Sequence, residues 1–146
     1  MGAEVNVIKD KDSLPAPIVL LVKDKQGYIN LTKIVSKAYV DGQVNGEPMV
    51  ELSLLQNYSE GLIALSGGME GHVGQSVLAG NIPLTESRIK FFKSIFDEDF
   101  FIEVHRLGKT NEEEYNNAAV EIAIAARNMT IQRILKTSLK FIRNSL

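Results

Sequence analysis

Short, continuously apolar runs alternate along this chain with segments in which apolar residues recur every three or four positions. Runs of the first kind predict buried strands, at 5–8, 17–22, 62–66 and 100–104. Segments of the second kind predict amphipathic helices, at 31–41, 50–55, 85–96, 112–128 and 131–142. The alternation of strands and helices indicates α/β layers around a largely parallel sheet.

Polar residues just before three of these helices are suited to capping. Asn30, Thr85 and Asn111 can each accept a hydrogen bond from a backbone amide in the first helical turn, and we expect them to be the N-caps. The polar stretches 43–48 and 105–111 are expected to be loops.

A glycine-rich turn follows the third predicted strand. Gly67, Gly68 and Gly71 stand between that strand and the next helical segment, where backbone amides can approach a ligand closely. The spacing matches neither the Walker phosphate loop nor GxGxxG. The turn is therefore a candidate ligand site, and its alternative role is a tight connection between strand and helix.

The composition limits the possible chemistry. With 146 residues and 45% hydrophobic content, the chain is suited to one globular domain. It has no cysteine, so a metal would need carboxylates and the two histidines, His72 and His105. No apolar run has the length of a membrane span, and the first residues lack the order of a signal peptide. We therefore expect a cytoplasmic protein without membrane contact.

Charge is distributed unevenly along the chain. The net charge is −2, yet five basic and no acidic residues follow Glu121, which leaves the preceding part at −7. An acidic body is poorly suited to nucleic-acid backbone, so no direct DNA binding is expected. The basic tail is more typical of a solvated helix face than of an anion site.

Four segments together resemble the PHP (polymerase and histidinol phosphatase) domain of bacterial DNA polymerase III alpha subunits, of the proteobacterial type. They are GAEVNV at 2–7, GYINLTKIVSKAYVDG at 27–42, EGLIALSGGMEGHVGQSVLAGN at 60–81 and FFIEVHRLGKTNEEEYNNAAVEIAIAAR at 100–127. The resemblance implies a distorted β/α barrel with metal chemistry at the C-terminal ends of its strands. This chain would form part of such a barrel, incomplete at both ends, with an amphipathic C-terminal helix.

The resemblance covers residues 1–128, which we treat as a partial PHP domain. Residues 129–146 form a divergent, basic, amphipathic tail that we cannot align to the family. The composition changes where the family has its next strand. This change favours a frameshift or an artificial junction after Asn128.

The resemblance also implies a reduced set of metal ligands. Glu4 matches a ligand position of relatives that retain zinc or manganese, and Gly68 stands where such relatives often have a ligating side chain. His72 is a weaker candidate and His105 weaker still, because each can equally bond to backbone or water. Glu103 is expected to face solvent or to pair with a Lys or Arg. We expect no cofactor in this chain, although the parent polymerase would use magnesium.

Three functions follow from the resemblance. The first is a non-catalytic structural and interaction module of a replicative DNA polymerase, with the rest of the alpha chain and the proofreading exonuclease subunit as partners. The second is a metal-dependent phosphoesterase or 3′–5′ exonuclease that uses Glu4 and His72. The third is a truncated product with an incomplete fold and no function of its own. The resemblance places polymerase catalysis, a nucleotidyl transfer, in a separate domain whose aspartates are absent here.

Overall fold

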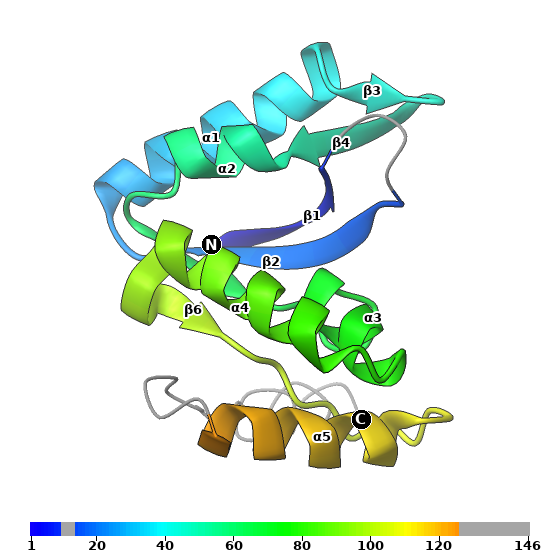
Figure 1. Ribbon diagram of the computed structural model, residues 1–146. Coiled ribbons are helices and arrows are strands. Elements are labelled where there is room, and N and C mark those ends of the chain that lie inside the picture. Colours follow the sequence, from blue (N-terminus) through cyan, green and yellow to red (C-terminus); the bar gives the residue numbers. More distant parts are fainter. Residues whose placement is uncertain (10–13, 126–146) are drawn as a thin grey trace, which may run out of the picture.

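The structure is a computed structural model that describes residues 1–9 and 14–125. Its described part contains one mixed sheet with the strand order β3-β4-β1-β2-β5-β6 (Figure 1). The strands are β1 (Gly2–Ile8), β2 (Ala16–Val22), β3 (Gln43–Val44), β4 (Glu47–Glu51), β5 (Leu62–Leu65) and β6 (Phe100–Phe101). The helices are α1 (Lys25–Val40), α2 (Leu52–Asn57), α3 (His72–Leu78), α4 (Ile82–Phe96) and α5 (Glu112–Ala125), with a 3₁₀ turn η1 (Asp97–Asp99). The predicted helix at 131–142 and the boundary at 128 lie outside the described residues.

Strand β2 lies at the centre of the sheet and pairs antiparallel with both β1 and β5. The pairs β1–β4 and β5–β6 are parallel, and β3–β4 is antiparallel. The prediction of a largely parallel sheet was therefore wrong, because only a short connection separates β1 from β2 and such a connection allows antiparallel pairing alone. The α/β class is confirmed, and the sheet is open, as expected of a partial barrel.

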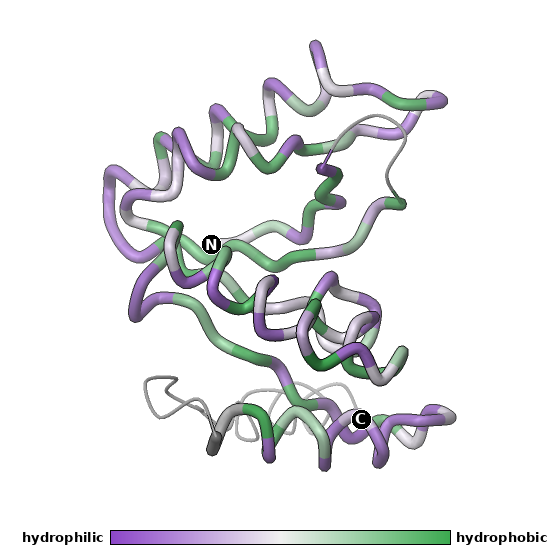
Figure 2. The backbone as a smooth tube through the Cα atoms, in the orientation of Figure 1, coloured by the Kyte–Doolittle hydropathy of each residue, from purple (hydrophilic) through white to green (hydrophobic). Residues whose placement is uncertain are grey.

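One face of the sheet forms the hydrophobic core with the helices. Its central members are fully buried, and in Figure 2 the helices that cover them alternate between hydrophilic and hydrophobic positions. The strands contribute Val7, Ile18, Leu20, Val50, Leu62, Ala64 and Phe100. The helices contribute Leu31, Ile34, Ala38, Leu55, Val73, Ile89, Phe92, Phe96, Tyr115 and Ala119. Burial of these side chains, at about 25 cal/mol per Å² of apolar surface, is the main source of stability.

The opposite face of the sheet is less well covered. Val19, Leu21 and Ile63 lie on it, because Leu21 pairs directly with Ile63 and paired residues share a face. All three side chains are only half-buried. Glu4 pairs with Val19 and projects from the same face. This face is therefore a partly apolar surface with a carboxylate in it.

A hairpin replaces part of the loop predicted at 43–48. β3 and β4 are joined by the two residues Asn45 and Gly46, whose φ angles are 54° and 85°. Positive φ at both positions is the geometry of a tight hairpin turn, and Asn-Gly is its usual sequence. As a consequence, the helix predicted at 50–55 begins two residues later, at Leu52.

Two of the predicted caps were wrong. α1 begins one and a half turns earlier than expected, where the Asp24 carboxylate accepts a hydrogen bond from Gly27 N at 2.9 Å. Asn30 lies inside α1, buried, and donates to the carbonyl of Glu60 at 2.8 Å. Asn81, not Thr85, caps α4. α5 begins directly after Asn111, as predicted.

Replacing Asp24 by Ala should lower the free energy of unfolding by about 1 kcal/mol, because the amide of Gly27 loses its acceptor. Asp41→Ala is a matched control at the opposite end of α1, where the exposed carboxylate faces the negative end of the helix dipole. Urea unfolding of both variants measures the difference. Equal losses in the two variants would contradict the assignment of Asp24 as the cap.

Candidate functional site

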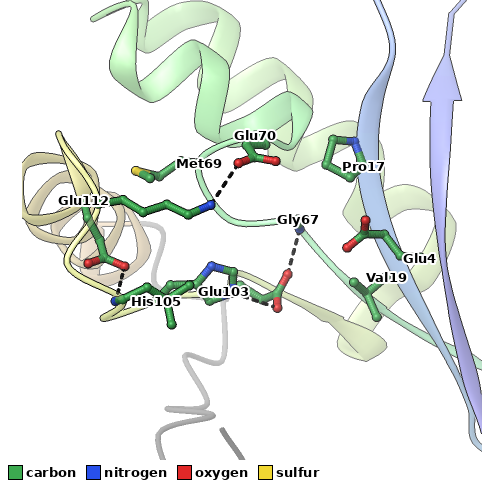
Figure 3. Close-up of a pocket in the computed structure, with 11 residues that line it drawn as sticks. Glu4, Pro17, Val19, Gly67, Met69, Glu70, Glu103, His105 and Glu112 are labelled. Atoms are coloured by element: carbon green, nitrogen blue, oxygen red, sulfur yellow. Dashed lines mark hydrogen bonds and ion pairs between the residues drawn. The ribbon is translucent and has the colours of Figure 1, made fainter.

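A pocket of about 170 Å³ opens where β1, β2, the turn after β5 and the segment after β6 meet (Figure 3). Its charged lining is mainly acidic, which disfavours a phosphate. The charged and titratable residues are Glu4, Glu70, Glu103, His105, Lys109 and Glu112. The remaining lining residues are Pro17, Val19, Gly67, Met69 and Leu107. Glu4 points from β1 toward this pocket (Figure 3).

Glu103 is the best-connected residue of the pocket. One carboxylate oxygen accepts a hydrogen bond from Gly67 N at 2.9 Å. Its own amide donates to Ser66 Oγ at 3.0 Å, and its carbonyl accepts from Tyr115 Oη at 2.8 Å. The expectation that Glu103 faces solvent or pairs with Lys or Arg was wrong, because β6 ends at Phe101 and the chain then turns toward the glycine turn.

His105 is the partner of the second carboxylate oxygen of Glu103. His105 Nε2 lies 3.2 Å from Glu103 Oε1. This hydrogen bond raises the pKa of His105 above its usual value, and burial opposes the effect. The side chain of Asn116 donates to the carbonyl of His105 and fixes the backbone there. His105 and Glu103 together join the turn after β5 to the start of α5.

Tyr115 holds the same segment from the side of α5. Its side chain is fully buried, and burial raises the pKa of Tyr115 to about 12. The hydroxyl therefore stays protonated and donates a hydrogen bond to the Glu103 carbonyl.

The other acidic side chains at the mouth of the pocket are also engaged. Glu112 accepts hydrogen bonds from Leu107 N at 2.6 Å and Gly108 N at 2.7 Å. These bonds lower the pKa of Glu112 and close the loop before α5. Glu70 pairs with Lys109 at 3.2 Å, an exposed pair that contributes little to stability.

His72 is placed elsewhere. It begins α3, and its Nε2 lies 3.1 Å from the carbonyl of Val7. Its ring stands 6.2 Å from that of Phe92, and its own carbonyl accepts from Arg88. Burial, and then the charge of Arg88, lowers the pKa of His72. His72 does not line the pocket, so the structure does not bring it together with Glu4.

The glycine turn is tight. Gly67 and Gly68 have φ angles of 76° and 59°, and Gly71 N donates to Gly67 O at 3.1 Å. The Gly67 amide donates its hydrogen bond to the Glu103 carboxylate, so it is not free to bind an external anion. A Cβ atom at Gly68 would lie 2.9 Å from the His105 ring.

A divalent metal of the kind implied by the resemblance does not fit these residues. Within residues 1–9 and 14–125, no group of three or more His, Cys, Asp or Glu side chains is arranged to hold a metal ion. Glu4 lines the pocket, whereas Glu103 and His105 are bonded to each other. The assignment of Glu4 and His72 as ligands stays a prediction.

A sequence model of the PHP domain matches residues 1–107. The chain belongs to the PHP domain family. Among curated proteins it is similar to DNA polymerase III subunit alpha of Vibrio cholerae, with 41% identity over 106 residues, 73% of this chain and 9% of the relative. The same protein of Escherichia coli K12 is 37% identical over 147 residues, 99% of this chain and 12% of the relative. That of Pseudomonas aeruginosa is 36% identical over 115 residues, 79% of this chain and 10% of the relative.

The comparisons confirm the resemblance. The chain spans 9% to 12% of the length of these curated relatives. The alignment covers 99% of this chain for the Escherichia coli relative but 73% and 79% for the relatives from Vibrio cholerae and Pseudomonas aeruginosa. The boundary at residue 128 and the junction after it stay predictions. In the described part of the chain, no helix has both the length and the apolar character needed to cross a membrane.

The Glu103–His105 hydrogen bond predicts a pH dependence of stability. A histidine whose folded pKa is raised contributes stability that is complete below its unfolded pKa, near 6.5, and that is lost as pH rises through the folded pKa. Thermal unfolding between pH 6 and 9 should therefore show this loss, and His105→Gln should reduce it. Glu103, Glu112 and Lys109 supply the other charges that act on His105.

His72→Gln is the control for that experiment. The pKa of His72 is lowered, so its contribution has the opposite sign and is lost as pH falls below about 6.5. A pH profile that is unchanged in His105→Gln would contradict the role of the pair.

Proposed function

We propose that this chain is part of a cytoplasmic DNA polymerase III alpha subunit, in which it serves as a non-catalytic structural and interaction module. The family match and the names of the relatives support the context. One observation carries the non-catalytic part. Glu103, the best-connected carboxylate of the pocket, accepts hydrogen bonds from the Gly67 amide and from His105, so both of its oxygens serve the fold.

The rest of the alpha chain is the first proposed partner. The alignment with the Escherichia coli relative is 99% of this chain and 12% of that relative, which is therefore about eight times as long as this chain. The sheet face with Val19, Leu21 and Ile63 is only half-buried. Covering such side chains removes apolar surface from water and favours association. The proofreading exonuclease subunit is the second proposed partner, and this proposal rests on the family resemblance. Direct DNA binding is not proposed.

Leu21→Lys should weaken association with the remaining part of an alpha subunit by at least about tenfold, which corresponds to about 1.4 kcal/mol. The reason is that a charge would enter a half-buried apolar face. Tyr39→Lys is the control, because Tyr39 lies on α1 with 60% of its surface exposed. Titration calorimetry measures both affinities, and circular dichroism checks that both variants fold. Equal affinities of the two variants would show that the sheet face with Leu21 does not form the contact.

Binding of the exonuclease subunit is a separate experiment. We expect affinity in the micromolar range for a specific, transient interface. Absence of binding below the millimolar range would exclude this partner while leaving the association with the alpha chain in place.

Catalysis is the competing function, and the convergence of Glu4, Glu103 and His105 on one pocket is the observation that favours it. A metal-dependent phosphoesterase or 3′–5′ exonuclease would release phosphate or nucleotides with manganese or zinc and would lose this activity in Glu4→Ala. We expect no activity above the Glu4→Ala background. Metal-dependent hydrolysis that disappears in this variant would replace the non-catalytic proposal.

A further inference from the structure

Position 68 lies against the His105 ring. A Cβ atom built on Gly68 would be 2.9 Å from two ring atoms, Cε1 and Nδ1, closer than real Cβ contacts come. The imidazole therefore fills the space into which any side chain at this position would project. Position 68 therefore cannot add a ligand to the pocket while His105 stays where it is.

His105 is held in this place by one bond to its ring and one to its backbone. Nε2 contacts Glu103 Oε1 at 3.2 Å, and Asn116 donates to the carbonyl of His105. Glu103 is fixed in turn by the Gly67 amide at 2.9 Å and by Ser66 Oγ at 3.0 Å. Its side chain is only 14% exposed, so these contacts are largely shielded from water.

Two other carboxylates of the pocket also bond to protein groups. Glu70 pairs with Lys109, and Glu112 accepts two backbone amides. Among the described residues, Glu4 alone of these carboxylates has no hydrogen-bond or ionic partner. A divalent cation needs several oxygen or nitrogen ligands oriented toward one point, and here Glu103, Glu70 and Glu112 are each oriented by bonds to other protein groups.

We propose that the Glu103–His105 pair takes the place of a divalent metal in this chain: it cross-links the glycine turn to the segment before α5 and closes the pocket to cations. His105 is thus a positioning residue that acts through Glu103 and Gly68. The inference deepens the proposed function and rests on its non-catalytic part.

A double-mutant cycle in the 146-residue chain tests the steric part. Gly68→Ala, His105→Ala and the double variant are compared by thermal unfolding, with Gly80→Ala as the matched control. Gly80 has a φ of 64°, close to the 59° of Gly68, but nothing lies within 4 Å of its Cβ position. Gly80→Ala therefore reports the backbone strain alone, a decrease in Tm of about 3–6 °C.

Gly68→Ala should lower Tm at least about twice as much as Gly80→Ala, because the ring clash adds to the strain. In the His105→Ala background its effect should fall to that of Gly80→Ala. The same loss in both backgrounds would overturn the proposal. If His105→Ala does not fold, His105→Asn removes the ring, keeps a polar group and completes the cycle.

Manganese titration of the same chain tests the chemical part. Calorimetry should show no stoichiometric binding up to 1 mM Mn²⁺, and Tm should be unchanged by Mn²⁺ or by a chelator. Stoichiometric binding that is lost in Glu4→Gln would overturn the proposal. If such binding occurs without phosphate-ester hydrolysis, the proposed function stands and only this inference fails. Hydrolysis would instead remove the proposed function as well.

Discussion

The position of β2 between β1 and β5 determines the geometry of the pocket. Pairing with β5 brings the end of β2 so close to the following turn that a Cβ atom at Gly67 would lie 2.2 Å from the carbonyl of Pro17. The residue there must be glycine, in a left-handed conformation that other residues rarely adopt. In this conformation the Gly67 amide donates to Glu103, and Glu103 then orients His105. The strand order therefore determines the positions of Glu103 and His105 through the amide of Gly67.

The Glu103 carboxylate accepts the hydrogen bond that the Gly67 amide could have donated to an external ligand, and it thereby stabilises the glycine turn. Hydrogen bonds to a charged group contribute about 1.5–3 kcal/mol each, and an unpaired, half-buried carboxylate would be unfavourable by a similar amount. Glu103 therefore stabilises the turn only while its partners are present, and the partners depend on Glu103 in return. Such mutual dependence is consistent with a site that has a structural role in a family whose members often hold metals there.

Hydrophobic periodicity was sufficient to predict most of the elements. The strands near 17–22 and 62–66 and the helix near 85–96 were found because their apolar residues meet one core. The caps at Asn30 and Thr85 were misplaced because polar residues further upstream, Asp24 and Asn81, cap α1 and α4. Asn30 instead donates to the carbonyl of Glu60. The hairpin at Asn45 and Gly46 was missed, although Asn-Gly is the usual sequence of a tight hairpin turn, because the prediction rested on apolar residues and its two short strands contain few of them.

The site was less predictable than the fold. Glu4 was predicted to be a metal ligand through the resemblance. It lines the pocket, and its role as a ligand stays a prediction. The pairing of Glu103 with His105 was missed, although Glu-x-His after an apolar run places both side chains on one side of an extended chain. The hydrogen bond from Gly67 to Glu103 depends on the crossover from β5 to β6, and the sequence does not encode that juxtaposition locally. Ser66 and Tyr115 were missed for the same reason.

In the part of the chain that the structure describes, the sheet ends at β3 on one side and at β6 on the other, and each of these strands has only two residues. Short edge strands give a neighbouring molecule few backbone groups with which to extend the sheet, and addition of strands is the usual route by which open sheets aggregate. Backbone pairing through β3 or β6 is therefore limited to a few hydrogen bonds. Recognition by a second protein would then depend on side chains, which differ between proteins, and not on the peptide groups that all proteins share.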